Sequence, residues 1–315
     1  MKLHLVLFTI LLIGLGVLLG TCRERDKKGR ILDNATSGSI RIAVDESLRP
    51  LFEAELDTFN GTYKYASVKA SYVSEGEAVD ALLKDSVRLA VITRKLTPEE
   101  ANVLIRLNLF PHQTKVAKDA IALILNKTNP DSTLQFAQLK AIMEGKVTQW
   151  KELNSKSKLG PFEVVFDHPQ SGIIRFLKDS VANVVKLPGD FYAVKSNKAV
   201  VEYVSKKPNA IGLIGVSWIS DKDDATASEF LKTIRVASLS RDSDAVQPYQ
   251  AYIANREYPL RRDIFIISRE ARSGLGTGFS AFVAGDKGQR IVLKSGMVPA
   301  TMPVRIVVVN KNKFP

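Results

Sequence analysis

The chain has 315 residues, of which 45% are hydrophobic and 25% charged. This balance excludes a disordered protein and suits one large domain or two modest lobes. The 45 lysine and arginine residues exceed the 33 aspartate and glutamate residues, and the formal net charge of +12 favours anionic partners. The basic residues are spread along the chain without interleaved aromatic residues, which argues against nucleic acid as the partner.

The N-terminal residues resemble a bacterial lipoprotein signal. Lys2 precedes the apolar run LVLFTILLIGLGVLLG, which has the size of a secretory signal and ends at Thr21-Cys22. Because LGTC is similar to a lipobox, we expect a signal peptide over residues 1–21 and lipid attachment at Cys22. An uncleaved anchor helix is the alternative. A membrane-spanning helix needs ~20 apolar residues, and this apolar run is nearly that long. Both interpretations place the rest of the chain outside the cytoplasm, and we expect the periplasmic face of a bacterial membrane.

Within residues 22–37, Cys22 is followed by the polar, mostly basic stretch RERDKKGR, which indicates a flexible tether between the membrane and the folded part. A contact of this stretch with anionic lipid headgroups is the alternative to a solvated linker. Cys22 is the only cysteine in the sequence, so the mature body has no disulfide and depends on its core for stability.

From residue 39 the sequence alternates short strands with amphipathic helices. The period-two pattern of SIRIAV predicts a strand at 39–44, and DESLRPLFEAELDTFNG predicts a helix that Ser47 caps and Gly61 ends. Thr97 and Pro98 form the start signal of a later helix. Between and after these lie strands at VKASYV (68–73), LAVIT (89–93) and KDAIALILN (118–126), with a helix at EAVDALLKD (77–85).

The remainder of the chain continues this alternation. Ser132 and Gln135 form a capping box before LQFAQLKAIMEG, which Gly145 ends, and the strand FEVVF (162–166) leads directly into HPQSGIIRF. Later elements are expected in SNKAVVEYVSKKPNAIGLIGVS (helix, then strand), TIRVASLS and RDIFIIS (strands), GFSAFVAGDKGQRIVLKSGMVP (two helices) and the closing RIVVVN. The pattern predicts an α/β architecture with mostly parallel sheets.

Signatures of known enzyme classes are missing from the sequence. His4, His112 and His168 stand far apart and have no metal-ligand neighbours at the usual spacing. The chain contains no HExxH, GxSxG or P-loop motif, and GLGTGF (274–279) lacks the spacing of the dinucleotide fingerprint. We therefore expect a protein that is not an enzyme and that needs neither a metal nor a cofactor.

Small polar residues gather at four strand ends, three of them followed by a helix. These junctions are DES (45–47), SEGE (74–77), TRKLT (93–97) and QSG (170–172). Ligands of open α/β sheets bind outside the carboxyl ends of the strands. Helix N-termini present unpaired backbone N–H groups and a partial positive charge there. If the junctions converge, they form a donor-rich site for an oxyanion, whereas a serine in one of them alone is usually only a helix cap.

Arg175 follows the last junction as the fourth helical residue, if Ser171 is the N-cap. Positive charge is disfavoured near a helix N-terminus, and the side chain leans toward that end. A bound anion would compensate the arginine, and an i,i+4 pair with Asp179 is the alternative, with ~0.2–0.5 kcal/mol of stabilisation.

Several stretches together resemble the phosphate-binding proteins of the Pst ABC importer, among the two-lobed periplasmic solute-binding proteins. The resemblance covers nearly the whole mature chain. In matching order and spacing it is carried by LAVITRKLT, KDAIALILNKTNP, LKAIMEGKVTQWKELN, Ser171-Gly172, AIGLIG, YPLRRDIFII and GQRIVLKSGMVP. It implies a type II periplasmic-binding-protein fold, whose two lobes close about a hinge on an anion in the cleft between them. Residues 38–117 plus 259–315 would form lobe I, and residues 118–258 would form lobe II.

The family's binding residues carry over unevenly. Its fourth loop reads Arg-x-Asp-x-Ser-Gly-Thr, and this chain has Asp167-His168-Pro169-Gln170-Ser171-Gly172-Ile173, so Ser171 and Gly172 match. Pro169 replaces a carboxylate that favours phosphate over sulfate, because phosphate keeps a proton at neutral pH. The residues that could replace the lost carboxylate are Asp45, Glu46, Glu75 and Asp167, and Arg94 and Arg175 could replace the lost arginine.

The sequence therefore predicts a monomeric solute-binding lipoprotein that captures phosphate or a related oxyanion for the permease of an ABC importer. The alternatives are a site with a changed ligand or low affinity, a sensor or scaffold that is not coupled to transport, and a phosphate-ester hydrolase. The expected ligand-binding residues are Asp45, Ser47, Ser74, Glu75, Thr93, Arg94, Ser171, Gly172 and Arg175.

Overall fold

The computed structural model describes residues 33–221, 223–241 and 244–304. The expected signal peptide, the lipid-attachment residue Cys22, most of the tether and the closing strand RIVVVN lie outside the described residues. Among the residues that are described, no helix has the length and apolar character needed to cross a bilayer.

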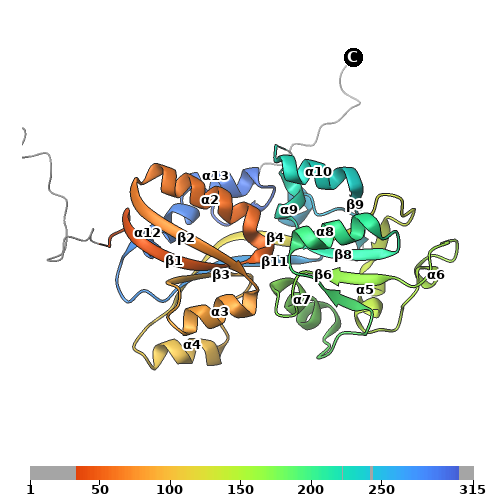
Figure 1. The fold of residues 1–315 in the computed structure, drawn as a ribbon, viewed down its shortest axis with the longest axis horizontal. Helices are drawn as coiled ribbons and strands as arrows, with labels where there is room; N and C mark the ends of the chain where they lie inside the picture. Colours follow the sequence, from red (N-terminus) through yellow and green to blue (C-terminus); the bar gives the residue numbers. More distant parts are fainter. Residues whose placement is uncertain (1–32, 222, 242–243, 305–315) are drawn as a thin grey trace, which may run out of the picture.

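One twisted sheet runs along the length of the molecule (Figure 1). Its strands, in spatial order, are β2 (Tyr65–Val73), β1 (Ser37–Asp45), β3 (Leu89–Ile92), β11 (Arg261–Ser268), β4 (His112–Asn126), β8 (Ala210–Gly215), β6 (Glu163–Phe166) and β7 (Phe191–Ala193). Two short strands, β9 (Ile234–Val236) and β12 (Val298–Pro299), also pair with β4, and β5 (Thr133–Gln135) pairs separately with β10 (Ser238–Ser240).

Strand β4 joins the two halves of this sheet. Its residues 112–120 pair with β11, and residues 121–125 continue into antiparallel pairing with β8. We call β2, β1, β3 and β11 the first half, and β8, β6 and β7 the second half. Pairing is parallel between β1 and both β2 and β3, and between β6 and both β7 and β8. The expectation of mostly parallel sheets is therefore wrong at the centre, where β4 and β11 run antiparallel to their neighbours.

Helices cover both faces of each half (Figure 1). The first half is covered by α2 (Arg49–Thr62), α12 (Leu275–Ala284) and α13 (Asp286–Lys294) on one face and by α3 (Glu75–Leu83) and α4 (Pro98–Ile105) on the other. The second half is covered by α8 (Asn197–Lys206), α9 (Ser217–Ser220) and α10 (Ala225–Thr233) on one face and by α5 (Phe136–Met143) and α7 (Gly172–Phe176) on the other. Shorter elements are η1 (Glu46–Leu48), α6 (Trp150–Leu153), the π-helical turn η2 (Leu177–Ala182) and α11 (Gln250–Ala254).

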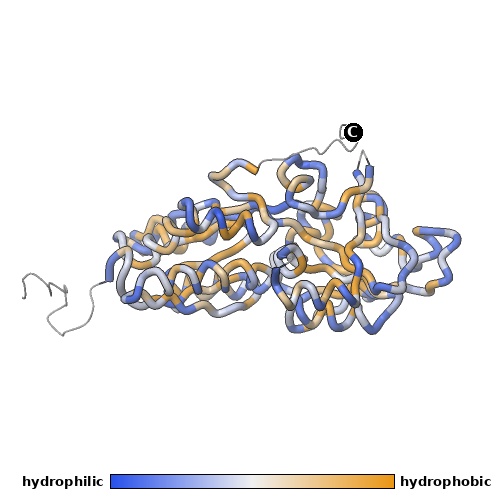
Figure 2. The backbone as a smooth tube through the Cα atoms, turned by 90° about the horizontal axis from the view of Figure 1, so that it is seen from above, coloured by the Kyte–Doolittle hydropathy of each residue, from blue (hydrophilic) through white to orange (hydrophobic). Residues whose placement is uncertain are grey.

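Apolar side chains from the sheet and its helices form the core between these layers, and Figure 2 shows hydrophobic stretches along the backbone of the elements that contribute them. In the first half, Phe59 of α2 packs edge-on against Phe279 and Phe282 of α12, with ring centroids 5.2 and 5.3 Å apart. Burial of each such side chain contributes about 1.5–3 kcal/mol. This packing holds α2 and α12 together on one face of the first half of the sheet.

Helix starts follow the expected pattern at two places and depart from it at two others. The side chains of Thr97 and Ser171 cap α4 and α7 as expected. Ser47 is not an N-cap, because the turn η1 precedes α2 and the carboxylate of Asp45 caps that turn. The expected capping box at Ser132 is also wrong: residues 133–135 form β5, and Gln135 stands at the N-cap of α5.

Glu55 of α2 is a buried carboxyl group for which we expect an effect on stability. Its side chain is 0% exposed and, among the described residues, neither carboxylate oxygen has a hydrogen-bond partner. Burial raises the pKa of Glu55 to about 9. The folded protein therefore keeps this proton while the unfolded chain releases it near pH ~4.3, so the destabilisation grows from about pH 4 up to the folded pKa.

We expect Glu55→Met to raise the free energy of unfolding by about 3 kcal/mol at pH 7 and by much less at pH 4. Methionine has a similar volume and helix propensity, so loss of the titrating group dominates the change. Denaturant unfolding at both pH values measures the effect. Glu53→Met, at an exposed position of the same helix, is the matched control. An equal gain at pH 4 and pH 7 would contradict the account.

Candidate functional site

The four polar junctions meet between the two halves of the sheet. The ends of β1, β2 and β3 bring Asp45, Glu75 and Thr93 to one edge, because parallel strands end on the same side. The β6–α7 junction brings Gly172 and Arg175 to the same place from the second half. The convergence expected from the sequence is therefore present in the structure.

The carboxylate of Glu75 lies at the centre of this cluster, with the side chain 2% exposed. Oε2 accepts hydrogen bonds from the backbone N–H of Thr93 at 2.8 Å and from its hydroxyl at 2.5 Å. Oε1 accepts from Nε of Arg175 at 2.5 Å, and Nε of Arg94 lies 3.3 Å away. Burial opposes ionisation of Glu75, but the charge of Arg175 and these hydrogen bonds outweigh it and lower the pKa of the carboxyl. Glu75 is therefore an anion surrounded by donors.

Arg175 forms the expected i,i+4 pair with Asp179, and its shorter contact is with Glu75, a partner that was not predicted for it. Besides Glu75, its Nη2 donates to the hydroxyl of Thr93 at 3.1 Å, and its Nη1 lies 3.7 Å from the exposed carboxylate of Asp179. The longer, exposed pair is the weaker one. The anion that compensates Arg175 in this structure is thus a carboxylate from the other half of the sheet.

Asp45 faces the start of α7 across the same gap. Its Oδ1 accepts from the backbone N–H and the hydroxyl of Ser47, and its Oδ2 accepts from the N–H of Gly172 at 3.2 Å. Burial raises the pKa of Asp45, against the charge of Arg262, which lowers it. Asp45 and Glu75 therefore both contact donors that a helix N-terminus or a strand end would otherwise offer to a ligand.

A buried arginine that was not predicted from the sequence lies beneath the first junction. Arg262 of β11 is 4% exposed, and its Nη2 donates to the hydroxyl of Ser47 at 2.7 Å. Its Nε and Nη2 contact Asp119 of β4, at 2.8 and 2.7 Å. The signal for this pair was available, because both charges interrupt apolar strands. Buried charges require partners, so each indicates a nearby opposite charge.

The fourth junction is built for close approach. Ser171 caps α7 by accepting from the N–H of Ile174 at 3.3 Å. A Cβ at Gly172 would lie 2.5 Å from Oδ2 of Asp45 and from Oγ1 of Thr93, and 2.7 Å from Oε2 of Glu75. Only glycine allows the two halves to meet at this point.

Asp167 and Asn197 extend the contact between the halves. Asn197 donates to Oε2 of Glu46 through its backbone N–H at 3.0 Å and through its side chain at 2.6 Å. The same side chain lies 3.4 Å from Oδ2 of Asp167, which is 1% exposed. Among the described residues, Oδ1 of Asp167 has no hydrogen-bond partner. Burial, and then the charge of Asp45, raise the pKa of Asp167 to about 7.

Two of the expected ligand-binding residues are engaged in local contacts. Ser74 forms a capping box with Glu77 at the start of α3. Arg94 forms a fork with Glu100, with Nη1 and Nη2 at 2.6 and 2.7 Å from the two carboxylate oxygens. Ser74 is therefore a helix cap in this structure, while Arg94 borders the cluster on its solvent side.

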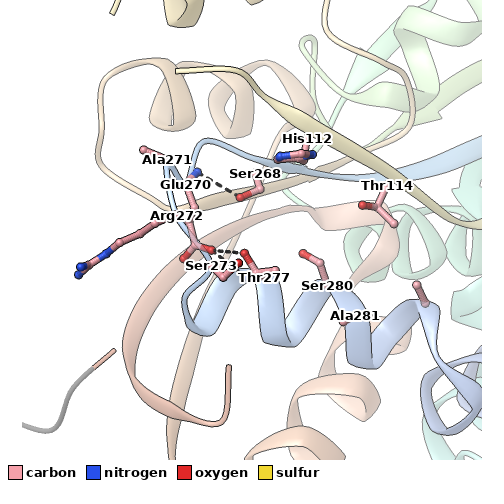
Figure 3. Close-up of a pocket in the computed structure, with 11 residues that line it drawn as sticks. His112, Thr114, Ser268, Glu270, Ala271, Arg272, Ser273, Thr277, Ser280 and Ala281 are labelled. Carbon is pink, nitrogen blue, oxygen red and sulfur yellow. Dashed lines mark hydrogen bonds between the residues drawn. The ribbon is translucent and has the colours of Figure 1, made fainter. Parts of the chain in front are cut away.

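A separate cavity of about 470 Å³ lies against α12, away from this cluster (Figure 3). Its main acidic group, Glu270, accepts from the N–H groups of Gly276 and Thr277 and from the hydroxyl of Thr277. Glu270 thus satisfies the first turn of α12. In the part of the chain that the structure describes, no cluster of His, Cys, Asp or Glu has the arrangement needed for a metal ion.

Comparisons with known proteins agree on one family. The family model of a PBP superfamily domain matches residues 32–287. The phosphate-binding protein PstS of Staphylococcus aureus (strain USA300) is 24% identical over 282 residues, which cover 88% of this chain and 83% of that protein. The phosphate-binding protein PstS of Staphylococcus epidermidis is 24% identical over 292 residues, which cover 91% and 86%.

Solved structures share the fold. One from Clostridium perfringens, described as a phosphate ABC transporter substrate-binding protein with bound phosphate, has a TM-score of 0.71 and 24% identity, and the match covers 83% of this chain and 99% of that chain. An ABC-type phosphate transport receptor from Vibrio cholerae has a TM-score of 0.62 and 20% identity, covering 83% of this chain and 100% of that one.

Proposed function

The chain belongs to the PBP superfamily, and from this premise we propose that it is an extracytoplasmic solute-binding protein. It captures phosphate or a related oxyanion and delivers it to the permease of an ABC importer. The observation that carries the proposal is the set of donors around Glu75. The N–H and hydroxyl of Thr93 and the guanidinium of Arg175 surround a carboxylate as they would surround an oxyanion ligand.

Glu75 acts in this proposal as a carboxylate that occupies the oxyanion position until the ligand displaces it. Glu75 belongs to the first half of the sheet and Arg175 to the second, so separation of the halves breaks their ion pair. Phosphate then takes the donors of Thr93 and Arg175. Because phosphate carries a proton at neutral pH, a buried carboxylate such as Asp45 can accept a hydrogen bond from it, whereas sulfate has no proton to offer.

The two halves with their helices form the two lobes of this proposal, residues 38–117 plus 259–315 and residues 118–258. The chain passes from one lobe to the other within β4 and returns just before β11, and we assign the hinge to these two crossings. The contacts of Gly172 with Asp45 and of Asn197 with Glu46 then form on closure. The ligand leaves chemically unchanged, so the protein acts as a receptor and not as an enzyme.

Asp167 makes ligand binding depend on pH. Its pKa of about 7 lies well above the ordinary value of an aspartate, so the side chain is neutral below this pH and adds a negative charge to the cleft above it. We expect Asp167→Asn to bind phosphate about tenfold more tightly than the unchanged protein at pH 8 and equally well at pH 5.5. Calorimetric titration at both pH values measures the ratio of the phosphate affinity of the variant to that of the unchanged protein. The change in the protonation of phosphate between the two pH values affects both affinities equally and cancels in this ratio. A ratio that does not change with pH would contradict this role.

The anchoring proposal concerns Cys22. We propose that the chain is a lipoprotein attached through this residue, on the strength of the LGTC motif after the apolar run. Cells grown with a labelled fatty acid should incorporate the label into the protein, and Cys22→Ser should abolish incorporation. Absence of label from the unchanged protein would contradict lipidation and favour an uncleaved anchor helix, and label retained in Cys22→Ser would contradict attachment at this residue.

Uptake of radiolabelled phosphate by phosphate-starved cells tests the transport role. Deletion of the gene should reduce uptake, and the intact gene should restore it. A variant with Arg175→Ala should fail to restore uptake although the protein accumulates. Unchanged uptake on deletion, together with phosphate binding in vitro, would favour a sensor or scaffold over a transport receptor.

A further inference from the structure

A cavity of about 460 Å³ opens beside the Glu75 cluster and shares residues with it. Thr93, Arg94 and Arg175 line the cavity from the cluster, and Lys118, Arg262 and their neighbours line it from β4 and β11. One water molecule needs only about 10–15 Å³ of such volume, so the cavity holds many water molecules. This space exceeds the need of one tetrahedral oxyanion.

The wall of this cavity is strongly basic. Seven of its 11 residues are lysine or arginine, and one, Asp263, is acidic. Four of the seven cations contact carboxylates: Arg94 with Glu100, Arg175 with Glu75, Lys115 with Asp263 and Arg262 with Asp119. Fixed positive charge on low-dielectric walls concentrates anions from solution. The remaining three cations therefore decide what the cavity attracts.

Those three cations are Lys118, Arg256 and Arg261. Among the residues that the structure describes, no carboxylate oxygen lies within 4 Å of the charged nitrogens of these three residues. Nε of Arg261 is buried without a hydrogen-bond partner among the described residues. Burial, and then the charge of Arg256, lower the pKa of the Arg261 guanidinium. Positive charge thus exceeds negative charge along this side of the cleft.

Arg262 provides a second, independent observation. It is 4% exposed and lines the cavity, and its Nη1 is buried without a hydrogen-bond partner among the described residues. An unpaired N–H on a buried guanidinium is costly, and an anion in the cavity removes that cost. Guanidinium groups suit phosphoryl oxygens, because their N–H groups form a planar fork.

We propose that this cavity is a second phosphoryl subsite, so that the preferred ligand is a condensed phosphate such as pyrophosphate. One phosphoryl group takes the position of the Glu75 carboxylate, and the next lies against Lys118, Arg256, Arg261 and Arg262. The shared residues Thr93, Arg94 and Arg175 make the two subsites adjacent. This inference rests on the proposed function, since it assigns a ligand class to the same cleft.

Calorimetric titration of the full-length, phosphate-free protein tests the proposal, with phosphate, pyrophosphate and glycerol 2-phosphate at ~0.15 M ionic strength to screen surface charge. Glycerol 2-phosphate fills space but has one phosphoryl group. The variants are Arg256→Gln/Arg261→Gln and, as a milder change, Lys118→Gln. The control is Arg41→Gln/Lys69→Gln, which removes two exposed charges outside the cleft.

We expect pyrophosphate to bind at least tenfold more tightly than phosphate or glycerol 2-phosphate. The double variant should reduce this preference to less than threefold while phosphate affinity changes by less than twofold. Lys118→Gln should also reduce the preference for pyrophosphate, whereas the control variant Arg41→Gln/Lys69→Gln should leave this preference unchanged. Pyrophosphate binding no tighter than phosphate would overturn the subsite and leave the proposed function standing. Equal weakening of all three ligands in the cavity variants would also overturn it. Absence of binding by every ligand would instead refute the proposed function.

Discussion

Replacement of Glu75 by glutamine is expected to tighten phosphate binding by about tenfold or more. The carboxylate competes with the ligand for the N–H and hydroxyl of Thr93 and for the guanidinium of Arg175. Glutamine keeps the size of the side chain but removes the charge that pairs with Arg175. Hydrogen bonds to charged groups contribute about 1.5–3 kcal/mol, and 1.4 kcal/mol corresponds to a tenfold change in affinity. Calorimetric titration at pH 7 measures the change.

Glu99→Gln is the matched control for this variant, because Glu99 is exposed on the neighbouring helix α4 and should leave affinity unchanged. Without phosphate, Glu75→Gln should lower the melting temperature, since it leaves Arg175 without its buried partner. Phosphate should then restore more stability to the variant than to the unchanged protein. Weaker phosphate binding by Glu75→Gln would instead indicate that Glu75 accepts the proton of bound phosphate, and would contradict its role as a competitor.

Replacement of Gly172 by alanine is expected to reduce phosphate affinity by about 100-fold or more. The added methyl group would lie 2.5 Å from Asp45 and Thr93, which belong to the opposite half of the sheet. Gly172 does not have a positive φ angle, so alanine causes no backbone strain at this position. The methyl group therefore acts as a wedge that keeps the halves apart, and small displacements of binding groups cost large factors in affinity.

Gly160→Ala is the control, because a Cβ there has no atom within 4 Å. Titration with phosphate gives the affinities, and small-angle X-ray scattering with and without phosphate reports closure as a decrease in the radius of gyration. Gly172→Ala should show no such decrease, whereas Gly160→Ala should behave as the unchanged protein. Phosphate-dependent compaction of Gly172→Ala would contradict the wedge.

The sequence predicted those parts of the site that depend on local pattern. Ser171 is recognisable as an N-cap because the helix that it caps follows it directly in the sequence, and the structure confirms that cap. The alternation of strands and helices indicated where the polar junctions would meet. Ser47 was misread, because it lies within the three-residue turn η1 that precedes α2, and a turn of that length shows no hydrophobic periodicity.

The charge network could not be predicted in the same way, because its partners are distant along the chain. Glu75 contacts Thr93 across 18 residues and Arg175 across 100. No local propensity reports such pairs, and the sequence offers several carboxylates for each arginine. The substitution of Asp167 and Pro169 for the family's charged residues indicated a rebuilt site, but only the fold reveals that Glu75 lies among the donors.

The most direct test of the account is equilibrium dialysis of the phosphate-free, full-length protein with radiolabelled phosphate, with unlabelled sulfate as competitor. We predict saturable binding of one phosphate per chain that Arg175→Ala weakens by at least tenfold and that an equal concentration of sulfate does not displace. Absence of saturable phosphate binding, or equal displacement by sulfate, would contradict the central claim that this cleft is a phosphate receptor.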